Sequence, residues 1–361
     1  MSPGPIFGGG HELSGRARWL LPLFLIVLVG LTYWRFQHAP PQTIHVFNGK
    51  TMGTTYTVKV ATEKLEPELR KKIAAAIIRE LQNIESLMSN YDPESELSRF
   101  NALGAGIPFA VSLQTLEVFQ EAQRVFEMTG GAFDVTVGPL VNLWGFGPGE
   151  FKQEIPDPAE VERLRELVGL KHIEINRSMR TLTKKQPGMV CDLSALAKGY
   201  GVDRVAEALT ALGIENYLVE VGGELRAKGS KLDGKQWRVA VEKPETGRTQ
   251  AVKLIHLNNL SMATSGDYRN YFEVDGVRYS HTIDPRKAMP VRHNLASVTV
   301  FHREAMAADA LATALSVLGA DEGMTLADKH DLAVLFVVRE VNQEFRILES
   351  PAFTRTLGRE E

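Results

Sequence analysis

The chain has 361 residues, a formal net charge of −3 at pH 7 and a single cysteine, Cys191. This length allows one large domain or two, and the balanced charge argues against a nucleic-acid-binding protein, which usually carries a concentrated basic face. One cysteine excludes an internal disulfide framework and a zinc site built on cysteines alone.

The N-terminal segment predicts a membrane anchor. Arg16 and Arg18 precede an uncharged apolar run from Trp19 to Trp34. The run is short for a span, which needs about 20 residues, but aromatic residues flank it at both ends. No small-residue cleavage site follows, so an uncleaved anchor is favoured over a signal sequence that is removed. The two arginines before the run, against Arg35 beyond it, favour a body outside the cytoplasm, which in a bacterium is the periplasm.

The first half of the body predicts strands followed by helices. Residues 43–61 are rich in Thr, Val and Tyr and are broken by Asn48-Gly49, which predicts a hairpin or two strands. Apolar residues recur every three or four positions over 67–90 and again over 113–128, which predicts two amphipathic helices. Residues 91–101 predict a turn and a short helix, and 132–150 a strand followed by a loop.

The second half of the body predicts more strand than helix. A helix is expected at about 159–168, two strands follow, and a helix begins near Asp192 or Ser194, either of which suits an N-cap. Most of 216–301 and 332–350 predicts strand, with a helix at 306–319 between the two. Because there is no regular βα alternation, we predict an α+β fold with mixed, largely antiparallel sheets and packed helices.

Familiar phosphate-loop, zinc-protease, esterase and dinucleotide motifs are absent from the sequence. Polar clusters on turns remain, each with two interpretations. Asp192, Ser194 and Lys198 suit either a phosphate site or an ordinary helix cap, and the cap is favoured. Gly222-Gly223 suits a β-bulge or a close ligand approach, with the bulge favoured.

Two further clusters are ambiguous in the same way. His281, with Asp284 three residues on, suits an acid–base pair or a solvated loop. Residues 262–272 are most simply a polar hairpin. Asp309 and Thr313, four apart on an otherwise apolar helix, suit either a solvated edge or a buried carboxylate with a compensating partner.

Taken together, these clusters resemble the successive motifs of the ApbE family, the FAD:protein FMN transferases. The motifs stand in that family's order and cover almost everything from residue 43 to the C-terminus: TMGTTYTVKV, SNYDPESELSRFN, GGAFDVTVGPLVNLWGFG, CDLSALAKGYGVDRV, VEVGGELRAKG, MATSGDYRNYF, YSHTIDPRKAMP and AADALATAL. The resemblance implies a flavin transferase domain at 43–361, and the N-terminal pattern predicts a leader at 1–18, an anchor at 19–36 and a linker at 37–42.

The resemblance also implies a set of site residues around FAD bound in a cleft. The cofactor contacts would be Met52, Tyr91, Ala132, Phe133, Asp134, Asp192, Lys198 and Ile283, with core packing as the alternative for Met52, Phe133 and Ile283. Asp309, Thr313 and the backbone carbonyl of Ala195 would ligate Mg²⁺, which prefers such hard oxygen ligands. His281 and Asp309 are the expected catalytic residues, with His281 taking the acceptor's proton.

The implied reaction is Mg²⁺-dependent transfer of FMN from FAD to a Ser or Thr hydroxyl of a target protein, with release of AMP. By resemblance, the acceptors are subunits of membrane redox complexes of the sodium-translocating quinone reductase or Rnf type. The N-terminal pattern predicts that the enzyme acts at the periplasmic side of the inner membrane. Two alternatives remain open at this point: a Mg²⁺-dependent FAD pyrophosphatase and a flavin-binding carrier without turnover.

Overall fold

The computed structural model describes residues 24–31, 43–148, 153–245, 250–266, 271–341 and 344–358. The chain divides into two compact units, Met1–Gln42 and Thr43–Glu361. In the first unit, residues 24–31 are helical. Among the described residues no helix has the length and apolarity needed to cross a membrane, and the rest of the expected anchor lies outside them.

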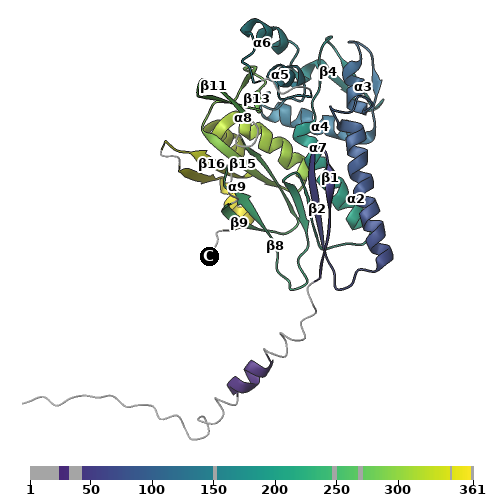
Figure 1. The fold of residues 1–361 in the computed structure, drawn as a ribbon, viewed down its shortest axis with the longest axis vertical. Helices are drawn as coiled ribbons and strands as arrows, with labels where there is room; N and C mark the ends of the chain where they lie inside the picture. The colour runs from purple at the N-terminus through teal and green to yellow at the C-terminus, as the bar shows by residue number, and fades with distance from the viewer. Residues whose placement is uncertain are drawn as a thin grey trace, which may run out of the picture. The chain divides into compact units, whose positions relative to one another are not determined.

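The second unit is built on one eight-stranded sheet (Figure 1). Each strand pairs with its neighbours in the antiparallel sense. In spatial order the strands are β1 (Ile44–Thr51), β2 (Thr54–Ala61), β6 (Tyr217–Val221), β7 (Glu224–Lys228), β10 (Leu260–Gly266), β15 (Leu295–His302), β16 (Ala333–Arg339) and β17 (Phe345–Glu349). With the helices described next, this sheet confirms the predicted α+β class.

Long helices cover one face of the sheet: α2 (Pro67–Met88), α4 (Leu113–Met128), α7 (Ser194–Ala211) and α8 (Ala305–Lys329). Their apolar sides and the inward residues of the strands form two large core clusters. The opposite face is covered by the hairpin of β8 (Trp237–Glu242) and β9 (Ala251–Leu257) and by α9 (Pro351–Leu357), around a third cluster. Central strands such as β16 are therefore apolar on both sides.

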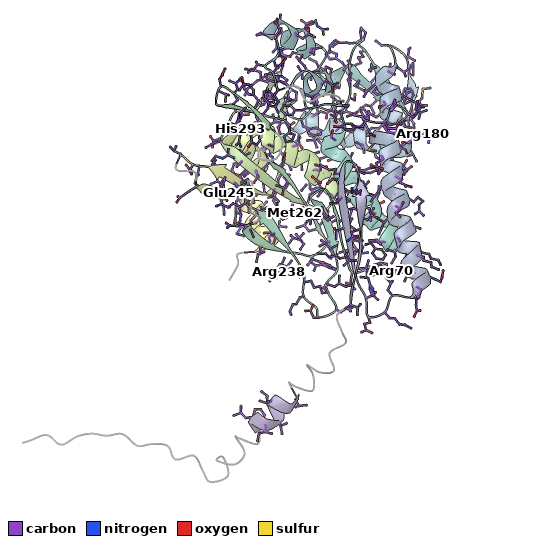
Figure 2. The ribbon with its side chains drawn as sticks, in the orientation of Figure 1. Arg70, Arg180, Arg238, Glu245, Met262 and His293 are labelled. Atoms are coloured by element: carbon purple, nitrogen blue, oxygen red, sulfur yellow. The ribbon has the colours of Figure 1, made fainter. Side chains whose placement is uncertain are left out.

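Smaller elements complete this unit. They are α3 (Glu96–Ala102), α5 (Gly138–Leu143), α6 (Pro158–Arg165), the 3-10 turn Leu170–His172, the sheet of β3 (Phe109–Ala110), β4 (Ile173–Asn176) and β5 (Thr181–Lys184), and the hairpins β11–β12 (Tyr271–Val274, Val277–Ser280) and β13–β14 (Ile283–Asp284, Met289–Pro290). Figure 2 shows Met262 within the sheet, whereas Arg70, Arg180 and Arg238 are exposed.

The first hairpin turns at a different place from the one predicted. Asn48-Gly49 lies within β1, and the turn is Met52-Gly53, whose φ values of 48° and 69° suit a tight two-residue hairpin turn. Gly49 faces Tyr56 across the strands, and a Cβ on Gly49 would lie 2.6 Å from Tyr56 Cε1. The glycine therefore makes room for an aromatic ring on the next strand.

The strand expected within residues 132–150 is also wrong. The carboxylate of Asp134 accepts hydrogen bonds from the Thr136 N–H at 2.8 Å and the Thr136 hydroxyl at 2.6 Å, which folds a turn. Helix α5 follows, with Pro139 in its first turn, where a missing N–H does no harm. A local side-chain bond thus overrides the β-propensity of the valines and threonine.

Two glycine-containing stretches also differ from their predictions. Gly222-Gly223 is not a bulge: it is the two-residue turn of the β6–β7 hairpin, with φ values of 62° and 107°. The stretch 262–272 is not simply a polar turn either, because 262–266 belongs to strand β10, while 267–270 lies outside the described residues.

Helix α8 runs beyond its predicted end and breaks at Gly319, where φ is 80° and ψ is −178°. His293 lies at this break: its Nε2 is 2.8 Å from the carbonyl oxygen of Ser316. A Cβ on Gly319 would lie 2.9 Å from the same imidazole ring. The segment of α8 before the break carries Asp309 and Thr313.

Candidate functional site

A cavity of about 1080 Å³ opens where α7, the first turns of α8, the β6–β7 hairpin, β10 and the 132–147 segment meet. Its size is at the upper end of small-molecule sites. The expected site residues that line it are Tyr91, Ala132, Phe133, Asp134, Asp192, Ala195, Lys198, His281, Ile283, Asp309 and Thr313. Segments separated by more than 200 residues in the sequence therefore meet around one space.

Met52 is the expected site residue that does not line the cavity. It is half-buried and packs against the two core clusters between the helices and the sheet. Its N–H donates a hydrogen bond to Glu85 Oε1, and its Cε lies 3.0 Å from the place a Cβ on Gly201 would take. The structure thus places Met52 with the core.

The start of α7 forms one wall of the cavity. The helix begins at Ser194 with Leu193 at the N-cap, so neither Asp192 nor Ser194 is the cap. Instead, Asp192 Oδ1 accepts hydrogen bonds from the N–H of Ser194, at 2.8 Å, and from its hydroxyl. The N–H of Asp192 donates to the Val135 carbonyl at 2.6 Å, which ties this wall to the 132–147 segment.

Two buried carboxylates share one ammonium group on that wall. Lys198 Nζ lies 2.9 Å from Glu224 Oε1 and 3.6 Å from Asp309 Oδ1. The N–H of Gly199 donates to Asp309 Oδ2 at 3.0 Å, so this N–H serves the carboxylate and not a phosphate. Asp309 and Glu224 are each 4% exposed.

The pKa values of these groups follow from burial and mutual charge. Burial raises the pKa of Asp309, against the opposing effect of Lys198. Burial likewise raises the pKa of Glu224, to about 7. Burial alone would lower the pKa of Lys198, but Asp309 and Glu224 outweigh it and raise that pKa. Lys198 therefore stays protonated, and its single positive charge is divided between two carboxylates.

This cluster suits a divalent cation. Two carboxylates facing one lysine leave an uncompensated negative charge, and Glu224 Oε2 is buried without a hydrogen-bond partner among the described residues. Thr313 and Ala195 add a hydroxyl and a backbone carbonyl to the same cavity. The described residues contain no group of three or more His, Cys, Asp or Glu side chains able to hold a metal, so a cation here would depend on mixed oxygen ligands and on phosphate or water, as Mg²⁺ commonly does.

His281 also lines the cavity and is half-buried, with its ring centroid 6.3 Å from that of Phe146. Asp284, the expected partner of His281, forms an ion pair with Arg286, whose guanidinium donates to both Asp284 oxygens at 3.0 Å. Burial alone would raise the pKa of Asp284, but the hydrogen bonds and charge of Arg286 hold that pKa below its ordinary value. Asp284 therefore anchors Arg286 and shapes the loop that carries His281 and Ile283.

The remaining expected residues differ in what they offer a ligand. Tyr91 is 77% exposed at the cavity, whereas Phe133, Ala132 and Ile283 are nearly covered. Asp134 lines the cavity, but its oxygens already accept bonds from Thr136 and from the Leu170 N–H at 3.0 Å. Burial raises the pKa of Asp134 in spite of those bonds.

Several lining residues were not singled out from the sequence. They are Phe146, Glu220, Glu224, Glu242, Thr264 and Tyr271. For Glu224 a signal existed, because it directly follows the Gly222-Gly223 pair and starts β7 facing Lys198. Thr264 and Tyr271 lie in the stretch 262–272, which the sequence predicts to be a polar hairpin. For Phe146, Glu220 and Glu242 nothing in the local pattern separates them from ordinary strand or loop positions.

Comparisons with known proteins place the chain in one family. A family model described as "ApbE family" matches residues 52–336. A curated FAD:protein FMN transferase of Vibrio cholerae is 44% identical over 93% of this chain and 99% of its own length. One from Haemophilus influenzae is 45% identical over 82% of this chain and 86% of its own length.

Solved structures show the same similarity. The flavin transferase ApbE from Vibrio cholerae superimposes with a TM-score of 0.80 at 44% identity and covers 88% of this chain and 100% of its own. The apo flavinyl transferase ApbE from Pseudomonas stutzeri gives a TM-score of 0.80 at 39% identity over 89% of this chain and 98% of its own.

Proposed function

The chain belongs to the ApbE family, and we infer from this membership and from its cavity that it is an FAD:protein FMN transferase. The observation that carries the proposal is the pair of buried carboxylates, Asp309 and Glu224, around Lys198 at the wall of a cavity large enough for a dinucleotide. Such a site can bind a pyrophosphate through a cation and a lysine. The flavin and adenosine parts would occupy the rest of the space.

The proposed reaction is a displacement at the phosphorus next to riboflavin. The hydroxyl oxygen of an acceptor Ser or Thr forms a bond to that phosphorus, and the bond from the phosphorus to the oxygen of AMP breaks. AMP leaves with the former bridging oxygen, and the acceptor carries FMN as a phosphoester. As in other phosphoryl transfers, positioning and charge stabilisation are expected to supply most of the rate.

Asp309, Thr313 and the carbonyl of Ala195 are the residues that we propose to hold Mg²⁺. Bound there, Mg²⁺ would neutralise charge that develops on the pyrophosphate oxygens. Lys198 would contribute a second positive charge beside the same phosphates, while Glu224 holds its ammonium in place. Asp192 and Tyr91 are proposed contacts to other parts of FAD, as are Ala132, Phe133, Asp134 and Ile283.

His281 is the proposed general base. It lies in the cavity lining, and an imidazole titrates close enough to neutral pH to accept the proton that the acceptor hydroxyl loses. The proton would move from the hydroxyl oxygen to an imidazole nitrogen as the new oxygen–phosphorus bond forms. Water could be activated in the same way, which would give hydrolysis of FAD to FMN and AMP.

The deciding experiment compares AMP release from FAD and Mg²⁺ with and without an acceptor. The test acceptor is a flavin-carrying subunit of a membrane quinone reductase or Rnf-type complex, with a variant whose target Thr is replaced by Val as the control. We expect slow release alone, faster release with the acceptor, and an acceptor mass increased by FMN only when the Thr is present. Equal AMP release in all three cases, with free FMN in the same amount, would instead identify a pyrophosphatase.

The N-terminal unit is proposed to anchor the enzyme in the inner membrane with residues 43–361 in the periplasm. The support is the uncharged run from Trp19 to Trp34 and the bias of arginines before it. In cell fractions we expect a full-length protein in the inner membrane that protease digests only after the outer membrane is opened. A shortened, soluble mature form would contradict this.

A further inference from the structure

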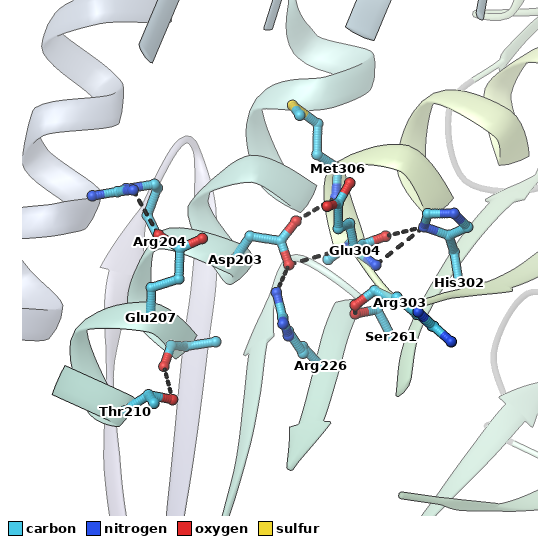
Figure 3. A network of polar contacts seen from close by, with 12 residues as sticks. Asp203, Arg204, Glu207, Thr210, Arg226, Ser261, His302, Arg303, Glu304 and Met306 are labelled. Atoms are coloured by element: carbon cyan, nitrogen blue, oxygen red, sulfur yellow. Dashed lines mark hydrogen bonds and ion pairs between the residues drawn. The ribbon is translucent and has the colours of Figure 1, made fainter. Parts of the chain in front are cut away.

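The N-terminus of α8 is held by a residue of another helix. Its N-cap, Glu304, makes no side-chain capping bond. Asp203 of α7 takes that role: Oδ1 accepts from the Ala305 N–H at 3.0 Å and Oδ2 from the Met306 N–H at 2.9 Å (Figure 3). A carboxylate at this position also interacts favourably with the helix dipole.

Arg226 of β7 completes the arrangement. Its Nη1 lies 2.6 Å from Asp203 Oδ1; Asp203 is 5% exposed, so its carboxylate is largely removed from water, whereas Arg226 is only half-buried. Glu224, two residues earlier on the same strand, pairs with Lys198 in the same way. Strand β7 thus holds α7 through two ion pairs, one at Lys198 and one at Asp203.

Helix α7 also contacts α8 at two positions one turn apart, Gly199 and Asp203, which we call its two levels. At the Asp203 level, α7 binds the first N–H groups of α8; one turn earlier, the Gly199 N–H binds the carboxylate of Asp309. The two helices are very close between these contacts, since a Cβ on Gly199 would lie 2.3 Å from the Ala305 carbonyl oxygen. A shift of α8 along α7 would therefore break both levels together.

We propose that Asp203 is a positioning residue that sets the place of α8 and thereby aligns Asp309 and Thr313 with the Ala195 carbonyl for the metal. Asp203 does not line the cavity and does not touch the ligand site. The proposal rests on the proposed function, because it concerns the same metal site. Residues that orient metal ligands typically change metal affinity by roughly 10- to 100-fold when removed.

The test measures binding of Mn²⁺, added alone to the full chain and followed by electron paramagnetic resonance, together with the Mg²⁺ concentration that half-activates FMN transfer. We expect Asp203→Ala to weaken Mn²⁺ binding by roughly 10- to 100-fold and to raise the half-activating Mg²⁺ concentration similarly. Asp203→Asn, which keeps one acceptor oxygen, should give a smaller change. If Asp203→Ala does not fold, Mn²⁺ binding and the half-activating Mg²⁺ concentration are measured on Asp203→Asn and Arg226→Met instead.

Ser350→Ala is the matched control. The Ser350 hydroxyl caps α9 by accepting from the Phe353 N–H at 3.1 Å and is buried on the other face of the sheet. Its loss should lower the melting temperature without changing Mn²⁺ affinity. If the Asp203 variants behave like Ser350→Ala, less stable but with wild-type Mn²⁺ affinity, the positioning role is wrong.

Failure of the proposed function gives a different pattern. In that case the unaltered chain itself would neither bind Mn²⁺ in an Asp309-dependent manner nor transfer FMN, and the positioning role would fall with it. Binding and transfer by the unaltered chain, with no effect of the Asp203 variants on either metal measurement, would overturn the positioning role alone.

Discussion

The two faces of the eight-stranded sheet bury different kinds of side chain. Between the sheet and the helices α7 and α8, the carboxylates of Asp203, Glu224 and Asp309 are buried, and each is paired with a lysine or an arginine. Beneath α9 and the β8–β9 hairpin, the buried cluster consists of apolar side chains such as Trp237 and Phe353. Buried charge is unfavourable unless it is compensated, whereas buried apolar surface contributes directly to folding.

The charged groups on the helical side carry the proposed chemistry, and the apolar packing on the α9 side contributes mainly to stability. Each of these carboxylates pairs with a cation from a different element, so its position is determined by contacts between elements. On the α9 side, Trp237 and Phe353 do not line the cavity, so their main contribution is packing. We therefore expect substitutions on the helical side to affect activity more than stability, and substitutions on the α9 side to do the reverse.

The strongest test of this separation is Asp309→Ala. Loss of the carboxylate should remove the main charged ligand of the proposed metal, and metal stabilisation of developing charge is worth several kcal/mol. We expect FMN transfer to fall by about a thousandfold, or ~4 kcal/mol. The loss of stability should be smaller, because burial already disfavours this charge, although the Gly199 N–H loses its acceptor. Steady-state transfer and circular dichroism melts measure the two effects, and unchanged Mg²⁺ dependence would contradict the assignment.

Phe353→Ala tests the other face. Phe353 is fully buried and its ring packs edge-on against Phe301 at 5.4 Å between centroids. A large-to-small substitution of this kind typically lowers the free energy of unfolding by about 3–5 kcal/mol. Urea denaturation should show this loss, while the transfer rate per folded molecule stays at the wild-type value. A parallel fall in rate under conditions where the variant is folded would show that the two faces are coupled.

His281→Ala should slow the chemical step without preventing FAD binding. General base catalysis contributes roughly a hundredfold or more, and the side chain forms only part of the cavity lining. Single-turnover transfer with saturating FAD measures the step, and quenching of flavin fluorescence measures FAD affinity. If affinity collapses while the single-turnover rate is retained, His281 binds FAD and another group takes the proton.

The long helices could be predicted closely because their signals are local. Helix α4 spans Leu113–Met128 as expected, since Ser112 caps it by accepting from the Thr115 N–H and its apolar positions repeat at helical spacing. The errors arose where particular contacts outweigh the local pattern: Gly49 lies inside a strand because it makes room there for the ring of Tyr56 on the next strand. At Asp134 the bonds to Thr136 and Leu170 replace the expected strand with a turn.

The site was predictable as a list of residues but not as a geometry. The family motifs pointed to Asp309 and Lys198, but not to the ion-pair contact between them across 110 intervening positions. The sharing of Lys198 with Glu224 and the capping of α8 by Asp203 depend on how β7 and α8 meet α7. No spacing within one segment contains that information.

The smallest effect that we predict concerns the ion pair between Asp284 and Arg286, which stabilises the loop that carries His281. Arg286 holds the pKa of Asp284 below its ordinary value, so the ionised carboxylate stabilises the folded chain. A carboxylate with a lowered pKa contributes this stability at pH values above its unfolded pKa of about 3.9 and loses it as the pH falls through the folded value. The contribution should therefore be present at pH 6 and absent at strongly acidic pH.

Asp284→Asn should accordingly lower the urea midpoint at pH 6, and its difference from the unaltered chain should shrink as the pH is lowered through 3. The asparagine keeps the size of the side chain but cannot pair with Arg286 as an anion, so the variant isolates the charge. A matched measurement on Phe353→Ala, whose loss is apolar, should show a difference that does not depend on this ionisation. If the Asp284→Asn difference stays constant over the same pH range, the pairing with Arg286 adds no stability and the loop that carries His281 is held by its other contacts.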